Sequence, residues 1–224
     1  MFSRNSIKMI VSDMAGTIIQ ENGIVYNALY NTIKLINPIL KREEINNFHG
    51  CSKKEVIDFF VDKERMNSPE VVKNNLNSEF NYFLKREYSD NSSVTLIDKN
   101  LPSFFNALRE QDIKVCLNTG YNKDIQKLLI DKFNLNDSID DFISSTQVSR
   151  GRPYPHMIKT LMRRNDINDP KSVIKIGDSL ADILEGKNAG CITVGVLSGA
   201  ETKGSLESKK PDYILDNIMK LRIN

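Results

Sequence analysis

The chain has 224 residues, enough for one α/β domain that carries a modest insertion. Its formal net charge of +2, with 40% hydrophobic and 27% charged residues, is ordinary for a globular protein and gives no reason to expect a nucleic-acid or membrane-surface partner. No apolar run reaches the roughly 18 residues that a transmembrane helix needs, and the apolar stretch at 7–11 is too short for a signal peptide, so we expect a cytoplasmic protein.

The first predicted elements are one buried strand and a long helical insertion. Residues 8–11 form a short apolar run of the kind found in strands that are buried on both faces. No convincing strand follows from about residue 20 to residue 90, but amphipathic patterns recur there. These helical patterns cover residues 25–35, 42–48, 53–63 and 69–88. We therefore predict a helical cap domain over residues 19–90, inserted into a core domain that comprises residues 1–18 and 91–224.

After the insertion, apolar strand runs alternate with helical patterns. The runs are rich in Val and Ile and lie at 113–117, 173–176 and 192–196, and 211–215 is a candidate for a last short strand. The helical patterns lie at 101–111, 123–133, 154–164 and 181–189. Strands that alternate with helices predict a doubly wound α/β fold, in which helices cover a parallel sheet.

Polar side chains follow three of the predicted strands. Asp13, Thr119 and Asp178 each stand two residues beyond a strand run. Because ligands bind beyond the carboxyl ends of parallel strands, we expect these residues to meet at one edge of the sheet. Two close carboxylates repel each other unless a cation lies between them, and such oxygen ligands suit Mg²⁺. The alternative is that these acids only cap turns or helices.

Three segments, in this order along the chain, resemble motifs of the haloacid dehalogenase superfamily of hydrolases. Residues 13–17 (DMAGT) resemble its first motif, residues 117–120 (LNTG) its second, and residues 177–182 (GDSLAD) its fourth. Each segment follows a predicted strand, and together they span most of the chain. The resemblance implies an enzyme with a Rossmann-like α/β core and an inserted cap.

The resemblance also implies roles for individual residues. Asp13 would attack phosphorus and form an aspartyl-phosphate intermediate. Mg²⁺ would lie between the carboxylates of Asp13 and Asp178 and the backbone carbonyl of Ala15, where it would neutralise charge on the phosphoryl oxygens. Thr119 would hold a phosphoryl oxygen. Asp182, one helical turn after Asp178, would orient its neighbours or a metal-bound water.

One residue departs from the common pattern of the superfamily. Most of its phosphatases carry a second aspartate two residues after the nucleophile, which protonates the leaving group, and this chain has Ala15 there. General acid–base help is worth roughly 10²–10⁴-fold in rate. Two interpretations follow: the enzyme has become weak or inactive, or its leaving group needs no such acid.

The second interpretation matches one branch of the superfamily, the phosphonatases or phosphonoacetaldehyde hydrolases, which also carry alanine in this place. In them a cap lysine forms a Schiff base with the substrate aldehyde, and the iminium accepts the electrons of the breaking C–P bond. Residues 151–155 (GRPYP) resemble the third-motif region of this branch, which implies that Arg152 pairs with a phosphoryl group. Residues 119–121 (TGY) match its second motif, which implies that Gly120 and Tyr121 bind substrate.

The lysine of that chemistry would be Lys53. Residues 50–53 (GCSK) resemble the loop that carries it, which also places Gly50 at the substrate. Two departures count against an imine: the histidine expected three residues after the lysine is Val56, and the methionine expected before the glycine is His49. A Lys53 that only binds substrate and a Lys53 that is simply solvated are the alternatives.

We therefore predict a magnesium-dependent, phosphonatase-like hydrolase that acts on a small phosphonate or phosphate through Asp13. Its most specific form would cleave a P–C bond through a Schiff base on Lys53. The alternatives are a phosphatase for a small monoester with a good leaving group, and a non-catalytic phosphate-binding protein that keeps the fold. Phosphonatases are often dimers that pair through their caps, so the resemblance also suggests a homodimer through the cap.

Overall fold

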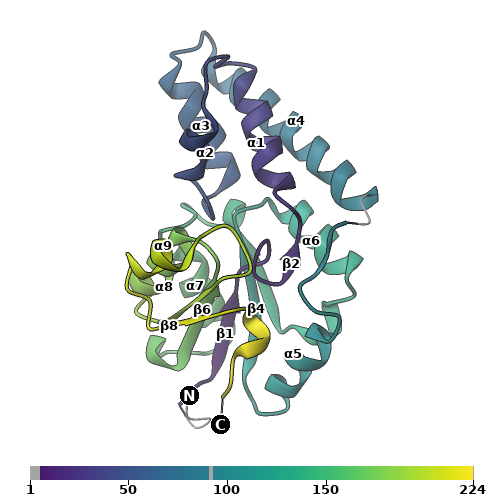
Figure 1. Ribbon diagram of the computed structural model, residues 1–224, viewed down its shortest axis with the longest axis vertical. Coiled ribbons are helices and arrows are strands. Elements are labelled where there is room, and N and C mark those ends of the chain that lie inside the picture. Colours follow the sequence, from purple (N-terminus) through teal and green to yellow (C-terminus); the bar gives the residue numbers. More distant parts are fainter. Residues whose placement is uncertain (1–5, 91–92, 224) are drawn as a thin grey trace.

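The computed structural model describes residues 6–90 and 93–223 of the chain. It contains a six-stranded sheet flanked by helices, and the helices α1 to α4 extend from one end of this sheet (Figure 1). The predicted α/β fold class, with its parallel sheet and its helical insertion, is confirmed. Among the described residues, no helix is long and apolar enough to cross a bilayer.

The sheet has the strand order β5-β4-β1-β6-β7-β8, and neighbouring strands are parallel throughout. The strands are β1 (Met9–Ser12), β4 (Lys114–Thr119), β5 (Asp141–Ser144), β6 (Val173–Gly177), β7 (Ile192–Val196) and β8 (Tyr213–Leu215). The chain runs from β1 to β4 on one side and later to β6 on the other, so the direction of winding reverses beside β1. A crevice at the carboxyl ends of the strands is the usual result of such a reversal.

The helices of the core lie between these strands along the chain. They are α5 (Leu101–Arg109), α6 (Lys123–Lys132), α7 (His156–Arg164), α8 (Leu180–Ala189) and α9 (Lys203–Glu207), with 3₁₀ turns at Asn136–Ser138, Ser145–Gln147, Pro170–Ser172 and Ile218–Lys220. Local residues fix the ends of α8, which carries part of the site. The Ser179 hydroxyl accepts the Asp182 N–H at its start, and Gly190 ends it in a left-handed conformation (φ 83°).

The inserted segment consists of four helices in the part of the chain that the structure describes. They are α1 (Ile24–Lys34), α2 (Arg42–Asn46), α3 (Lys53–Lys63) and α4 (Pro69–Asp90). Their apolar faces bury Leu29, Ile57, Phe60, Phe80 and Leu84 against one another. Two short antiparallel strands, β2 (Ile19–Gln20) and β3 (Thr95–Leu96), pair where the chain leaves for these helices and returns from them. The cap boundaries at residues 19 and 90 stay a prediction.

Three strands, β2, β3 and β5, were not predicted because they are too short or too exposed to leave an apolar pattern. β5 reads Asp-Phe-Ile-Ser, lies at the sheet edge and has only two fully buried residues, so it lacks a continuous apolar run. β2 and β3 have two residues each, too few for any period to show. The helix predicted to begin at residue 154 begins at His156 because Pro155 disfavours a helical conformation in the residue before it.

Candidate active site

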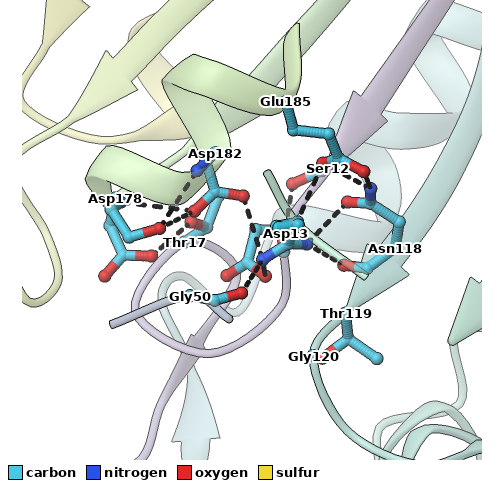
Figure 2. A network of polar contacts seen from close by, with 12 residues as sticks. Ser12, Asp13, Thr17, Gly50, Asn118, Thr119, Gly120, Asp178, Asp182 and Glu185 are labelled. Carbon is cyan, nitrogen blue, oxygen red and sulfur yellow. Dashed lines mark hydrogen bonds and ion pairs between the residues drawn. The ribbon is translucent and has the colours of Figure 1, made fainter. Parts of the chain in front are cut away.

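Three carboxylates converge at the carboxyl end of the sheet. Asp13 follows β1, Asp178 follows β6, and Asp182 lies in the first turn of α8. One oxygen from each lies within 4.8 Å of the others, and all three residues are buried (Figure 2). We refer to these three residues as the acid cluster. The structure thus brings together acids that are up to 169 positions apart in the sequence, counted from Asp13 to Asp182.

Arg152 joins the acid cluster to the strand beside it. Its Nη1 lies 2.7 Å from Asp13 Oδ1 and 3.0 Å from Asp182 Oδ1. Its Nη2 donates to the backbone carbonyl and the side-chain oxygen of Asn118, at 2.8 and 2.7 Å. Its Nε lies 3.1 Å from Glu185 Oε2. The side chain is 1% exposed, so the guanidinium is a fixed positive charge that holds one oxygen of Asp13 in place.

Lys175 is a second buried cation in the same network. Its Nζ lies 2.8 Å from Asp182 Oδ1, 2.7 Å from Asn118 Oδ1 and 3.5 Å from Glu185 Oε2. Lys175 and Glu185 are both 0% exposed, so bulk solvent does not reach these charges. Buried ions are tolerated when opposite charges and hydrogen bonds surround them, which is what this arrangement provides.

The charges of this network do not cancel. It holds four carboxylates, those of Asp13, Asp178, Asp182 and Glu185, against two cations, Arg152 and Lys175. With all six ionised the network carries two surplus negative charges in a buried place. A divalent cation that takes oxygen ligands would neutralise them, so the residues present fit a hard cation such as Mg²⁺.

The pKa values of the acids respond to this imbalance. Burial raises the pKa of Asp178 well above its usual value, and the neighbouring carboxylates of Asp13 and Asp182 raise it further. Burial also raises the pKa of Asp13, against the opposing effect of Arg152. Burial alone would raise the pKa of Asp182 too, but Arg152 and Lys175 lower it overall. Asp182 is therefore the best compensated acid, whereas at Asp13 the effect of burial exceeds that of Arg152.

Asp178 is held by short backbone segments on two sides. Its Oδ1 accepts the Thr17 hydroxyl at 3.2 Å, and its Oδ2 accepts the Ala200 N–H at 2.7 Å. Gly16 has φ +82°, and a Cβ there would lie 2.4 Å from Asp178 Oδ2. A side chain at residue 16 is therefore excluded both by the backbone conformation and by the carboxylate.

The 50–53 loop of the insertion lies directly on the core. The Lys53 N–H donates to the Gly120 carbonyl at 2.9 Å, and Arg152 Nη1 donates to the Gly50 carbonyl at 3.2 Å. A Cβ on Gly120 would lie 2.3 Å from the Cys51 carbonyl oxygen, so the second-motif glycine permits this close contact. The structure places Gly50 and Gly120 together, and their predicted contacts with substrate stay a prediction.

Lys53 is buried, with 5% exposure, so the alternative of a simply solvated lysine is wrong. Its Nζ donates to the Cys51 carbonyl at 2.9 Å and lies 4.9 Å from the centre of the Tyr26 ring. Burial lowers the pKa of Lys53, although Asp13 among its neighbours opposes the shift. Lys54, the next residue, is exposed and pairs with Asp58. A desolvated amine beside the acid cluster is the form of lysine that can act as a nucleophile.

Thr119 and Tyr121 differ in where their polar groups point. Thr119 is buried at the end of β4, and its hydroxyl accepts the Tyr121 N–H at 3.3 Å. The Tyr121 hydroxyl shares a 2.7 Å hydrogen bond with that of Tyr88 in α4, which in turn donates to Glu21 at 3.1 Å. Tyr121 of the core is thus linked through hydrogen bonds to Tyr88, near the end of the insertion, and to Glu21, near its start. The predicted substrate contact of Tyr121 stays a prediction.

Comparison with known families agrees with this geometry. Residues 10–196 match the family model of haloacid dehalogenase-like hydrolases. The chain belongs to the haloacid dehalogenase-like hydrolase family. The predicted family is confirmed, and the matched residues include the acid cluster, the 50–53 loop and Arg152.

Within the haloacid dehalogenase-like family, the chain is similar to phosphonoacetaldehyde hydrolases. That of Latilactobacillus sakei is 31% identical over 134 residues, which are 59% of this chain and 51% of that protein. That of Bacillus cereus (strain G9842) is 35% identical over 104 residues, which are 46% of this chain and 39% of that protein. The chain thus spans about half or less of the length of these curated relatives.

Solved structures show the same haloacid dehalogenase-like fold over nearly the whole chain. A phosphonoacetaldehyde hydrolase-like protein from Oleispira antarctica has a TM-score of 0.79 and 21% identity, with 99% of this chain and 92% of that chain covered. A β-phosphoglucomutase from Clostridium difficile has a TM-score of 0.78 and 18% identity, with 96% and 93% covered. At these identities the likeness establishes the fold.

Several residues of this family site were not among the sequence candidates. Lys175 had a visible signal, because it is a charged residue inside an otherwise apolar strand run. Glu185 stands three residues after Asp182 and shares its face of α8. Asn118 lies within the second-motif segment 117–120, whereas Tyr26 had no such signal, since it contacts the 50–53 loop only through tertiary packing.

Proposed function

We propose that this protein is a magnesium-dependent hydrolase that cleaves the P–C bond of a small phosphonate aldehyde, with phosphonoacetaldehyde as the reference substrate. Asp13 would form the aspartyl phosphate and Lys53 the Schiff base. The observation that carries the proposal is the position of Lys53, a buried amine on a loop that is hydrogen-bonded to Gly120 and Arg152 at the edge of the acid cluster. The names of the relatives from L. sakei and B. cereus support the same substrate.

The phosphoryl group would be received by Asp13. Arg152 Nη1 binds Oδ1 of Asp13, which leaves Oδ2 as the oxygen that attacks phosphorus. The fixed guanidinium would also offset negative charge that develops on the phosphoryl oxygens. Mg²⁺, held by the carboxylates of Asp13 and Asp178 and the backbone carbonyl of Ala15, would supply further charge neutralisation. Asp182, compensated by Arg152 and Lys175, would keep both cations oriented.

The carbon side of the reaction would depend on Lys53. Its amine adds to the substrate carbonyl and water leaves, which gives an iminium. When the C–P bond breaks, its electron pair moves into the iminium and forms an enamine, while phosphorus bonds to Asp13. A leaving group of this kind takes no proton at the moment of cleavage. The absence of an acid at Ala15 is therefore consistent with P–C cleavage.

A second candidate is a phosphatase that acts on a small monoester with a good leaving group. Val56 favours it, because this residue is buried at 2% exposure and has no proton to exchange in the imine steps. In that case Lys53 would bind the phosphate ester as a cation, and no covalent adduct would form on it.

Borohydride trapping should separate these two functions. Reduction in the presence of phosphonoacetaldehyde is expected to place a mass adduct on Lys53 and to abolish activity, because a secondary amine cannot form a new imine. Lys53→Met should give neither adduct nor P–C cleavage. Lys54→Met is the matched control and should behave as wild type, since Lys54 is exposed and pairs with Asp58. Turnover of aryl phosphates without any adduct would favour the phosphatase.

Removal of the metal should abolish turnover reversibly, and Mg²⁺ should raise the melting temperature of the wild-type protein. Asp178→Asn is expected to raise the Mg²⁺ concentration needed for half-maximal activity by about tenfold or more, because it removes one anionic ligand. Activity against Mg²⁺ concentration and thermal shifts measure both effects. Asp166→Asn, an exposed position with φ 57° that asparagine tolerates, is the control. Full activity in excess chelator would contradict the metal requirement.

A further inference from the structure

Tyr26 lies against the 50–53 loop. It belongs to the first turn of α1, and its hydroxyl oxygen accepts the Gly50 N–H at 2.9 Å. Its ring lies 4.9 Å from Lys53 Nζ and 4.3 Å from the ring of His49, measured to ring centres. An oxygen that accepts a backbone hydrogen bond keeps its own proton for donation. The amine that would form the imine therefore lies over the ring of a residue whose hydroxyl can donate a proton.

Tyr26 also lines a cavity beside the acid cluster. A cavity of about 230 Å³ is lined by Tyr26 together with Ala15, Glu21 and Asp178. Its volume suits a molecule of a few heavy atoms, and one wall is the position where most family phosphatases carry their acid. Tyr26 reaches this cavity from α1 of the insertion, whereas Ala15 and Asp178 line it from the core.

Buried contacts hold Tyr26 in this position. Glu21, 7% exposed, accepts the Val25 N–H at 2.8 Å and the Gly23 N–H at 3.1 Å, which fixes the start of α1 two residues before Tyr26. The other nearby ring, His49, has Nδ1 3.4 Å from Glu201. Burial lowers the pKa of His49 despite that carboxylate, so the neutral ring is favoured. Tyr26 is thus the better placed proton donor.

We propose that Tyr26 is a catalytic residue that donates and recovers the proton of the Schiff-base steps at Lys53, in the role left open by Val56. This inference rests on the proposed function. The Lys53 amine adds to the carbonyl carbon, and a proton moves from nitrogen to oxygen to give a carbinolamine. Tyr26 then protonates that hydroxyl as the C–O bond breaks. The C–O electron pair leaves with the water molecule, and the nitrogen lone pair closes the C=N bond of the iminium.

The return step restores the tyrosine. The enamine left by C–P cleavage first takes a proton at its terminal carbon, equal to the one that hydrolysis of the aspartyl phosphate releases to water, and becomes the product iminium. A water oxygen then adds to the iminium carbon, and the Tyr26 phenolate takes a proton from that water. The resulting carbinolamine passes its hydroxyl proton to nitrogen as the C–N bond breaks, which frees acetaldehyde and the Lys53 amine. Burial raises the pKa of Tyr26 well above its usual value, and Asp178, Asp13 and Glu21 contribute in the same direction. The resting residue is therefore a neutral phenol, and the phenolate that follows donation lies beside the cationic iminium.

The test measures how fast the imine forms, using acetaldehyde as the probe because it is the carbon product of phosphonoacetaldehyde cleavage and has no C–P bond to break. The Mg²⁺-loaded protein is mixed with acetaldehyde and quenched with borohydride at successive times, and the adduct on Lys53 is quantified by peptide mass spectrometry. Tyr26→Phe should lower the rate by roughly 10²-fold or more, as expected for loss of a general acid. Its final extent of modification should equal that of wild type.

Tyr30→Phe is the matched control. Tyr30 lies one turn further along α1, and its hydroxyl donates to the Leu40 carbonyl at 3.3 Å, so it should leave both rate and extent unchanged. A wild-type rate in Tyr26→Phe would overturn the role of Tyr26. A lower final extent would overturn it as well, because it would show that the hydroxyl only holds the 50–53 loop in place. If the wild-type protein forms no adduct with either phosphonoacetaldehyde or acetaldehyde, the proposed function through an imine on Lys53 is itself contradicted.

Discussion

Replacing Asp13 by asparagine should lower turnover of phosphonoacetaldehyde by about 10⁶-fold, the size of effect seen when a covalent nucleophile is deleted. An amide oxygen is a poor nucleophile towards phosphorus and carries no charge to bind Mg²⁺. The remaining parts of the site, Arg152 and Lys53, would still bind the substrate. The loss should therefore appear in kcat, with a much smaller change in KM.

The same variant should fold normally, which makes the loss of activity interpretable. Burial raises the pKa of Asp13 in the folded protein, so its ionised form is less stable there than in the unfolded chain above the usual aspartate pKa. Removing that charge should leave the melting temperature at neutral pH unchanged or higher. Arg152 keeps its ion pairs with Asp182 and Glu185. Turnover within tenfold of wild type would show that the nucleophile lies elsewhere.

A direct measurement should accompany the kinetics. Rapid acid quenching during turnover should trap a phosphoryl group on Asp13 in the wild-type protein, and none in Asp13→Asn. Asp124→Asn, at an exposed position in the first turn of α6, is the control for an aspartate of the core that lies outside the acid cluster. A phosphoryl group on any other residue would contradict the proposed role of Asp13.

The parts of the fold that the sequence predicted are those in which burial leaves a continuous pattern. β1 and β6 are buried along their whole length, and both read as unbroken strand runs. Asp13 and Asp178 could be placed together because parallel strands present their carboxyl ends at one edge, and the register of β1 with β6 bears this out. β5 was not predicted because half of its residues are only partly buried, which interrupts the apolar pattern.

The parts of the site that could not be predicted depend on contacts between distant segments. Lys53 begins a helix, where most lysines are solvated, but here it is buried where the 50–53 loop lies against Gly120 and Tyr26. Tyr26 likewise has the spacing of an ordinary helix residue until Gly50 is placed beside it. Contacts between distant segments leave no periodic pattern in the sequence. Lys53 could therefore be predicted only from the resemblance to a motif, and Tyr26 was identified from the structure alone.

Replacing Lys175 by methionine should reduce the free energy of unfolding by about 3–5 kcal/mol, the cost of removing one partner from a buried ion pair. The change removes the ion pairs of Lys175 with Asp182 and Glu185, so Arg152 remains as the cation of the network. Both carboxylates are fully buried. Methionine has nearly the same length, so the loss would arise from charge and hydrogen bonding more than from packing. Urea unfolding monitored by circular dichroism measures it.

Lys114→Met is the matched control for this prediction. Lys114 begins β4, two strands from Lys175 in the same sheet, and pairs with Asp140 at 3.2 Å, but its side chain is 48% exposed. An exposed ion pair of this kind is worth about 0–1 kcal/mol. If the two variants lose the same free energy of unfolding, the buried ion pairs of Lys175 contribute no more to stability than the exposed ion pair of Lys114.

A double variant separates charge balance from shape. If uncompensated charge is what destabilises Lys175→Met, then adding Glu185→Gln should recover part of the lost free energy, because the amide keeps the size of Glu185 and removes one surplus negative charge. Mg²⁺ should stabilise Lys175→Met as well, since a bound cation offsets the same surplus. The double variant could instead lose more free energy of unfolding than the two single variants lose together. That result would assign the effect to lost hydrogen bonds around Asn118, which Lys175 and Glu185 both contact.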